Sequence, residues 1–153
     1  MKKFEQIIEN NCRVLGVPAP TLRIESAAFF STETTRAVLV ADEGALNDAA
    51  IVLNQRYVDL LRRDEEQAVL TLSHECRHLW QLKHEKIGGY RTSENLSVDE
   101  YNGQALEVDA WAWSSIAISF FFDKTPDFVK TFGEVLAKKI MDRAAEIVEK
   151  KIV

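Results

Sequence analysis

A His-Glu-x-x-His pattern, from His74 to His78, lies in the middle of an apolar segment of this 153-residue chain. The residues on both sides, at 68–72 and 79–80, are mostly alanine, valine, leucine and tryptophan, which favours a buried helix. Residues four apart on a helix differ by about 40° in direction, so both imidazoles point to one side and can hold one ion. Glu75 lies about 60° from His78, beside such an ion without being a ligand. A carboxylate in that place can accept a proton from a metal-activated water.

A catalytic zinc site needs three protein ligands and leaves a fourth position to water. Three later residues are candidates for the third ligand: His84, Glu107 and Asp109. His84 has the third-histidine spacing of metzincins, but Gln81 stands where that family needs a sharp glycine turn. Glu107 and Asp109 are about 200° apart on a helix, so they cannot both face the same ion. Small residues flank Glu107 along its helix and allow a close approach, so we choose Glu107 as the ligand and expect Asp109 to orient a neighbouring group.

These segments resemble the minimal gluzincin-type metallopeptidases, among them the ImmA/IrrE-like and related families encoded by phages and prophages. The resemblance rests on the motif His-Glu-x-x-His-Leu-Trp-Gln and, about 29 residues later, on Glu-x-Asp-Ala-Trp-Ala at 107–112. It implies a zincin-like domain in which a small sheet packs on the helix that carries the motif. It also implies a zinc ion held by His74, His78 and Glu107, with Glu75 as the general base. A protein substrate, such as a regulator in a phage or mobile-element context, is implied as well.

The first half of the chain predicts one helix and a small sheet. Apolar residues at helical spacing predict a helix over 4–15, which Gly16 ends. Short β-prone runs predict strands at 21–26, 37–41 and 51–53. Taken with the helical second half, they indicate an α+β fold, and the length suits a single domain, residues 1–153.

The second half of the chain predicts three helices. Asp64 can cap the first, with Gln67 reaching back to its amide, and this helix runs to about Lys86. A polar loop follows at 88–100, and a second helix covers 102–121. The third helix begins with Thr125 as its cap and Pro126 in its first turn, and one apolar stripe runs along it: Phe128, Phe132, Val135, Leu136, Ile140, Ala144 and Ile147.

Composition and charge exclude several classes of protein. Hydrophobic residues make up 46% and charged residues 28%, as in globular proteins. The net charge of −5 argues against a partner bound through a nucleic acid backbone. The longest uncharged run, 110–122, is shorter than the roughly 20 residues that span a bilayer. The chain lacks a secretory pattern, and we expect Cys12 and Cys76 to be reduced thiols in a cytoplasmic protein, with Cys76 facing the core rather than the metal.

The favoured function is therefore a zinc-dependent peptidase that acts on a peptide or protein, which would lie along an edge strand such as 37–41. Tyr90, Arg91 and Tyr101 lie in or beside the loop between the two ligand-bearing helices and are candidates for stabilising an oxyanion.

Two alternatives remain. One is a catalytically silent zincin-like module that keeps the metal and binds a partner. The other is a helical interaction protein without metal, in which Trp80, Trp111 and Trp113 anchor an interface. The oligomeric state is not predicted by the sequence.

Overall fold

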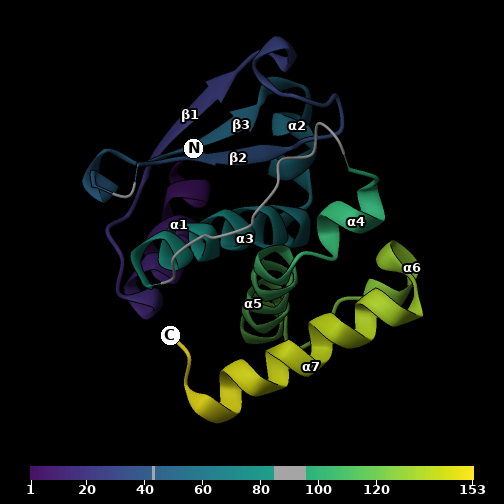
Figure 1. Cartoon of the computed structure of the whole chain (residues 1–153). Coiled ribbons are helices and arrows are strands. Elements are labelled where there is room, and N and C mark those ends of the chain that lie inside the picture. The colour runs from purple at the N-terminus through teal and green to yellow at the C-terminus, as the bar shows by residue number, and fades with distance from the viewer. Residues whose placement is uncertain (43, 85–95) are drawn as a thin grey trace.

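The computed structural model describes residues 1–42, 44–84 and 96–153. Within these residues, seven helices and a small three-stranded mixed sheet form an α+β fold (Figure 1), which confirms the predicted class. The elements in chain order are α1 (Lys2–Leu15), β1 (Thr21–Glu25), β2 (Ala37–Val40), β3 (Ala50–Asn54), α2 (Gln55–Arg63), α3 (Glu65–His84), α4 (Val98–Asn102), α5 (Ala105–Phe122), α6 (Phe128–Phe132) and α7 (Glu134–Lys150).

The sheet has the strand order β1-β3-β2, and all three strands lie where the sequence predicts them. β1 runs parallel to β3, whereas β2 runs antiparallel to it. All five residues of β3 are buried, as expected for a central strand with three consecutive β-branched and leucine residues at 51–53. β2 is therefore an edge strand of this sheet.

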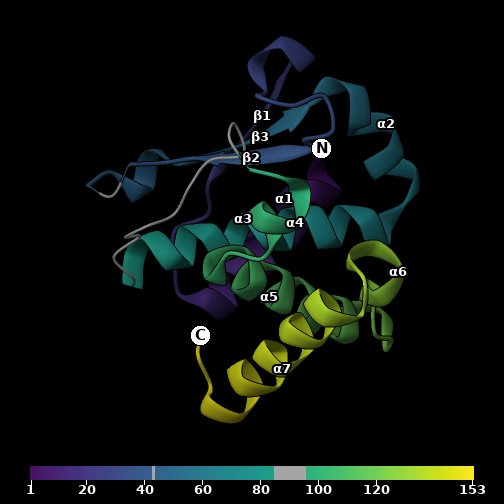
Figure 2. The ribbon, with the colours of Figure 1, turned by 45° about the vertical axis from the view of Figure 1, so that its right-hand side comes forward.

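Helix α3 lies at the centre of the molecule. Figures 1 and 2 show it between the sheet on one side and α5 on the other, with α7 packed on the far side of α5. Thirteen of its 20 residues are buried, so it has no solvated face along most of its length. The prediction of a buried helix around the His-Glu-x-x-His pattern is confirmed, and the buried polar residues of α3 must find partners inside the protein.

The N-terminus of α3 is capped as predicted, but only by half of the predicted pair of bonds. The amide of Gln67 donates to Oδ1 of Asp64 at 3.1 Å. The side chain of Gln67 does not return to the amide of Asp64, because its Oε1 accepts a hydrogen bond from Arg36 instead. The amide of Asp64 is already used, since it donates to the carbonyl of Leu60. The predicted end of this helix near residue 86 lies outside the described residues.

Two short helices were not predicted. Asn54 is the last residue of β3, and its side chain caps α2 by accepting from the amide of Arg56 at 3.1 Å. Only Val58 and Leu61 of α2 are buried, too few for a periodic signal. α4 begins inside the predicted loop at 88–100, where Ser97 and Glu100 form a reciprocal capping box.

The two C-terminal predictions need correction. The second helix begins at Ala105 rather than 102, because Gly103 ends α4 first. The third helix is two helices, since Gly133 adopts a φ of 79° between α6 and α7, a conformation that breaks a helix.

The capping and the apolar stripe of this region differ from prediction accordingly. Asp127, not Thr125, caps α6 by accepting from the amide of Lys130. The break at Gly133 changes the helical phase, so Val135 is 75% exposed although the stripe placed it in the core. The other six residues of the stripe are buried or packed against the core. Among the described residues, no helix has both the length and the apolar character needed to cross a membrane.

Candidate metal centre

Three side chains from two helices converge beneath the sheet. His74 and His78 lie one turn apart on α3, and Glu107 lies in the first turn of α5. Nε2 of His74 is 3.0 Å from Oε2 of Glu107, and Nε2 of His78 is 3.3 Å from Oε1. The two Nε2 atoms are 3.0 Å apart. The structure thus brings together the three residues that the sequence singles out, in a group that could hold a metal ion.

Close packing of α5 on α3 makes this convergence possible. Ala110, three residues after Glu107, is fully buried at the contact. One turn further on, the Ser114 hydroxyl donates to the carbonyl of Leu70 at 3.0 Å. The other small residue expected at this contact, Gly103, lies outside α5 at the end of α4. Small and hydrogen-bonding residues of α5 therefore set the distance at which Glu107 meets the two histidines.

The donor atoms fit a divalent cation such as zinc. Two imidazole nitrogens and one carboxylate oxygen form a donor set found in catalytic zinc sites. At a Zn–N distance of about 2.05 Å, tetrahedral geometry places two nitrogen ligands about 3.3 Å apart. The ligand atoms of His74, His78 and Glu107 lie within 4.8 Å of one another, and their nearest approaches of 3.0–3.3 Å match this spacing.

Burial and charge act against each other at Glu107 and His78. Glu107 is 1% exposed. Its burial raises the pKa of the carboxyl, but the charges and hydrogen bonds of His74 and His78 outweigh burial and hold that pKa far below its ordinary value. Burial lowers the pKa of His78, but the bond to Glu107 and its charge raise it to about 9. Without metal, the group therefore consists of an ionised Glu107 carboxylate beside a protonated His78 imidazole.

Glu75 lies beside this group and is not part of it. Burial raises the pKa of its carboxyl, although the charges of His74 and His78 lower it in part. The backbone N–H of Leu39 in β2 faces this carboxylate and also lowers its pKa in part. The sheet therefore touches the candidate site through its edge strand.

The pairing of β2 explains why Leu39 can reach Glu75. The amide of Asn54 donates to the carbonyl of Arg36 at 2.9 Å, so these two residues form a hydrogen-bonded pair. Bonded and non-bonded pairs alternate along an antiparallel ladder. The N–H and C=O groups of Ala37 and Leu39 consequently point away from β3. Among the described residues, the prediction of an edge strand at 37–41 is confirmed by β2, and its outward groups include the N–H of Leu39, which faces Glu75.

Gln81 connects His78 to Asp109. Nδ1 of His78 lies 2.8 Å from Oε1 of Gln81. Nε2 of Gln81 donates to Oδ2 of Asp109 and to the carbonyl of Leu106, both at 2.9 Å. Asp109 is turned away from the ligand group, as its position on the helix requires, and it orients a neighbouring side chain.

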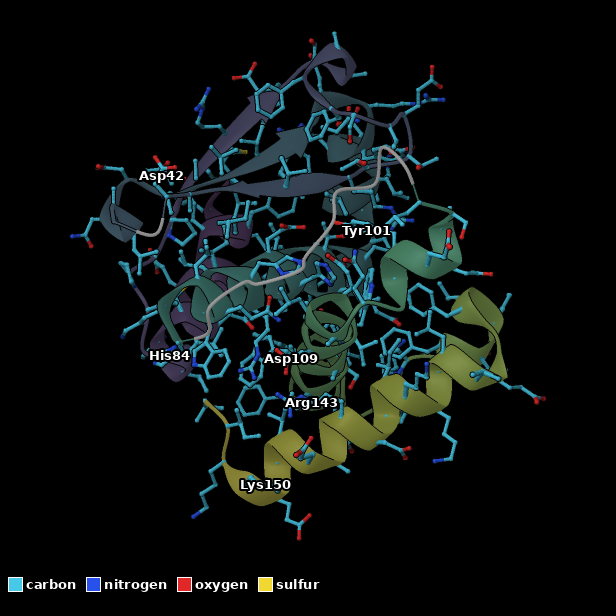
Figure 3. All side chains as sticks on the ribbon, in the orientation of Figure 1. Asp42, His84, Tyr101, Asp109, Arg143 and Lys150 are labelled. Atoms are coloured by element: carbon cyan, nitrogen blue, oxygen red, sulfur yellow. The ribbon has the colours of Figure 1, made fainter. Side chains whose placement is uncertain are left out.

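Two arginines hold Asp109. Nε of Arg77 on α3 donates to its Oδ2 at 2.7 Å, and Arg143 on α7 donates to its Oδ1 at 2.7 Å. Figure 3 shows Asp109 and Arg143 next to each other between α5 and α7. Burial raises the pKa of Asp109, but these partners outweigh it and lower that pKa.

His84 is not brought to the ligand group. Its Nδ1 lies 3.0 Å from the carbonyl of Trp80, and its ring stacks on that indole with 4.7 Å between centroids. Figure 3 shows His84 at the C-terminal end of α3. Cys76 is fully buried, with its Sγ 3.7 Å from that of Cys12, so it faces the core as expected.

The tryptophans are not exposed anchors. Trp80 and Trp113 are each 5% exposed, and their rings flank the Arg77 guanidinium at 3.7 and 5.5 Å from its Cζ. Trp111 is half-buried and packs on His74 with 4.3 Å between ring centroids. These contacts disfavour the alternative in which the tryptophans form an interaction surface.

Of the proposed oxyanion donors, only Tyr101 falls within the described residues. It lies on α4, half-buried, shortly before α5 begins (Figure 3). Tyr90 and Arg91 lie outside the described residues, so this assignment stays a prediction.

Sequence reasoning missed Gln81, Arg143 and the amide of Leu39. Gln81 could have been found, because it stands three residues after His78, on the same side of α3. Arg143 and Leu39 depend on contacts between distant elements, for which the sequence carries no local signal.

Neither a protein-family model, nor a curated protein, nor a solved structure matches this chain. The resemblance to minimal gluzincin-type peptidases therefore rests on the motif residues and remains a prediction. The described residues themselves establish a His-His-Glu group that could hold a metal ion, in which His74 and Glu107 are buried and His78 is half-buried, with a second glutamate beside it.

Proposed function

We propose that this chain is a zinc-dependent peptidase with a zincin-like, minimal gluzincin-type fold. The observation that carries the proposal is the convergence of His74, His78 and Glu107 on one point while Glu75 stays outside the group. Structural zinc sites are closed by four protein ligands, whereas catalytic sites use three and keep one position for water. A buried carboxylate beside a three-ligand site favours catalysis, because a structural site needs no base.

Different residues of the chain carry out different parts of the proposed hydrolysis. A zinc ion held by the three ligands would supply an acidified water, with a pKa of about 7, and a positive charge that polarises the substrate carbonyl. Glu75 would accept the proton of the attacking water and pass it to the leaving amine. Its raised pKa strengthens it as a proton acceptor.

The edge strand β2 offers a binding surface for the substrate backbone. The outward main-chain groups of Ala37 and the carbonyl of Leu39 can pair with an extended peptide. Since the backbone N–H of Leu39 faces Glu75, a peptide paired at this strand would run past the general base. The proposed substrate is therefore a peptide or protein segment in extended conformation, consistent with a net charge of −5, which does not favour nucleic acid.

The test compares hydrolysis by wild-type protein and by Glu75→Gln, both loaded with zinc. The probe is a mixed-sequence library of quenched fluorescent peptides, with cleavage sites read by mass spectrometry. We expect Glu75→Gln to bind zinc as the wild type does and to lose activity by at least about 100-fold, the usual contribution of a general base. Glu65→Gln is the matched control, because Glu65 lies on the same helix in an exposed ion pair with Lys3.

The possible outcomes separate the peptidase from the silent module. Hydrolysis by Glu75→Gln at the wild-type rate would reject Glu75 as the base. Zinc binding by the wild type without cleavage of any library peptide would favour a catalytically silent module that binds a partner.

A further inference from the structure

We propose that Gln81 is a positioning residue of the metal centre: it sets the tautomer and ring orientation of His78, and Asp109 in turn fixes Gln81. The inference rests on the proposed zinc site, because it concerns one of its ligands. It assigns a role to a residue that is not a ligand and that the sequence alone did not single out for this purpose.

The first step is the orientation of the Gln81 amide. One of its two polar ends lies 2.9 Å from Oδ2 of Asp109 and 2.9 Å from the carbonyl oxygen of Leu106. Both of these atoms are hydrogen-bond acceptors, since one is a carbonyl oxygen and the other already accepts from Nε of Arg77 at 2.7 Å. The second carboxylate oxygen of Asp109 likewise accepts from Arg77 and Arg143. The end that faces them must therefore be the NH2 group, and both of its protons are used. The amide cannot be turned over without placing oxygen against two oxygens.

The second step is the tautomer of His78. Once the NH2 end of Gln81 is assigned, the end that lies 2.8 Å from Nδ1 of His78 is the oxygen Oε1. An amide oxygen only accepts, so Nδ1 of His78 carries the proton. In the neutral ring Nε2 is then the nitrogen with a lone pair, and it is Nε2 that faces Glu107 at 3.3 Å. Gln81 thus selects the tautomer in which His78 can bind a cation at the convergence point.

The third step is the rigidity of the chain of bonds behind Gln81. Asp109 accepts bonds from Arg77 at 2.7 and 3.2 Å and from Arg143 at 2.7 Å. Arg77 is fully buried, and its Nη1 also donates to the carbonyl of Ile152 at 2.9 Å. The positioning chain is therefore anchored in α3, α5 and α7, and a shift of Gln81 would leave buried donors unsatisfied.

The two histidines differ in this respect. Nδ1 of His74 is buried and has no hydrogen-bond partner among the described residues. Its ring is held by packing on Trp111, 4.3 Å between centroids. Ligating histidines usually donate their other N–H to an acceptor that fixes the ring, and losing that acceptor weakens metal affinity about 10–100-fold. Of the two ligand histidines, only His78 has such an acceptor for its Nδ1 among the described residues. The metal affinity of the site should therefore depend on Gln81 in particular.

The experiment uses the full chain with Gln81→Met, which keeps length and apolar volume and removes both bonding functions. Gln67→Met is the matched control, because Gln67 lies on the same helix and bonds Arg36 away from the ligands. The dissociation constant for zinc is measured by competition with a chromophoric chelator. Circular dichroism and thermal melting of the metal-free variants check the fold. We expect Gln81→Met to bind zinc about 10–100-fold more weakly and Gln67→Met to bind as the wild type does.

A spectroscopic measurement on the wild type tests the proposal even if Gln81→Met does not fold. Nitrogen-15 spectra of histidine-labelled protein report which ring nitrogen carries the proton. We expect His78 to show an Nδ1 proton protected from exchange with water, and we expect this protection to be lost in Gln81→Met.

The outcomes distinguish this inference from the proposed function. A neutral His78 ring that carries its proton on Nε2 in the metal-free wild type, or unchanged zinc affinity in Gln81→Met, would overturn the role of Gln81 and leave the zinc site standing. A wild type that binds no zinc would reject the proposed function, and with it the role of Gln81 in positioning a ligand.

Discussion

Glu107 and His78 set the charge of the candidate metal centre. The carboxylate of Glu107 is almost fully buried and lies within hydrogen-bonding distance of both imidazoles. It raises the pKa of His78 to about 9, so the metal-free site holds a proton at neutral pH. A ligating histidine binds a metal through a free lone pair, so a metal that binds His78 must displace this proton.

We therefore predict that zinc binding at pH 7.5 releases close to one proton from His78. The raised pKa stabilises the folded, metal-free protein below the ordinary histidine value of about 6.5. This stabilisation disappears as pH rises through about 9, and apparent zinc affinity should rise over the same range. Isothermal titration calorimetry in buffers of different ionisation enthalpy measures the released proton. In metal-free Glu107→Gln, an NMR titration should show the pKa of His78 well below 9. Ordinary titration of His78 in the wild type would contradict the prediction.

At the scale of secondary-structure elements, the contact between α3 and α5 decides whether three ligands meet. Ala110 is fully buried at this contact, and Ser114 bonds the backbone of α3. A larger side chain at 110 would push the helices apart, because packed interiors have no spare volume. Glu107 lies one turn away, so its separation from the histidines would grow.

Ala110→Leu should therefore destabilise the protein by about 1–3 kcal/mol, as overpacking commonly does, and weaken zinc binding at the same time. Urea unfolding measures the first effect and chelator competition the second. Ala105→Leu is the matched control, since Ala105 is exposed at the start of the same helix. Equal behaviour of the two variants would show that the α3–α5 distance does not control the site.

At the scale of the whole molecule, Asp109 joins three helices through buried charge. Arg77 of α3 is fully buried, and Asp109 of α5 is its carboxylate partner, while Arg143 of α7 binds the same group. The guanidinium of Arg77 also lies close to two indole rings, with its Cζ 3.7 and 5.5 Å from their centroids. Removal of Asp109 would leave a buried positive charge without its carboxylate.

We predict that Asp109→Ala lowers the free energy of unfolding by about 3–5 kcal/mol, the usual cost of breaking a buried ion pair from one side. Asp142→Ala removes the same group from an exposed pair with Lys138, and it should cost at most about 1 kcal/mol. Urea unfolding at pH 7 measures both. A similar cost for the two variants would mean that Arg77 finds another partner or reaches water when Asp109 is absent.

The sequence by itself determined the class of fold and the members of the candidate metal group. Each of these inferences used residues close together in the chain: the helical spacing of His74 and His78, the apolar run of β3, and the opposite directions of Glu107 and Asp109 on one helix. Local spacing fixes where a side chain points around its own element, so such predictions need no knowledge of the partner element.

Only the tertiary structure decided what those side chains meet. The break at Gly133, the approach of the Leu39 backbone to Glu75 and the hydrogen bond from Arg143 to Asp109 all depend on how separate elements pack. Gln81 depends on both sequence spacing and tertiary structure. Its place on the same face of α3 as His78 follows from spacing, but its amide orientation follows from oxygens that α5 supplies. Contacts between elements are set by the balance of packing and buried hydrogen bonds over the whole core, and no local pattern in the chain encodes that balance.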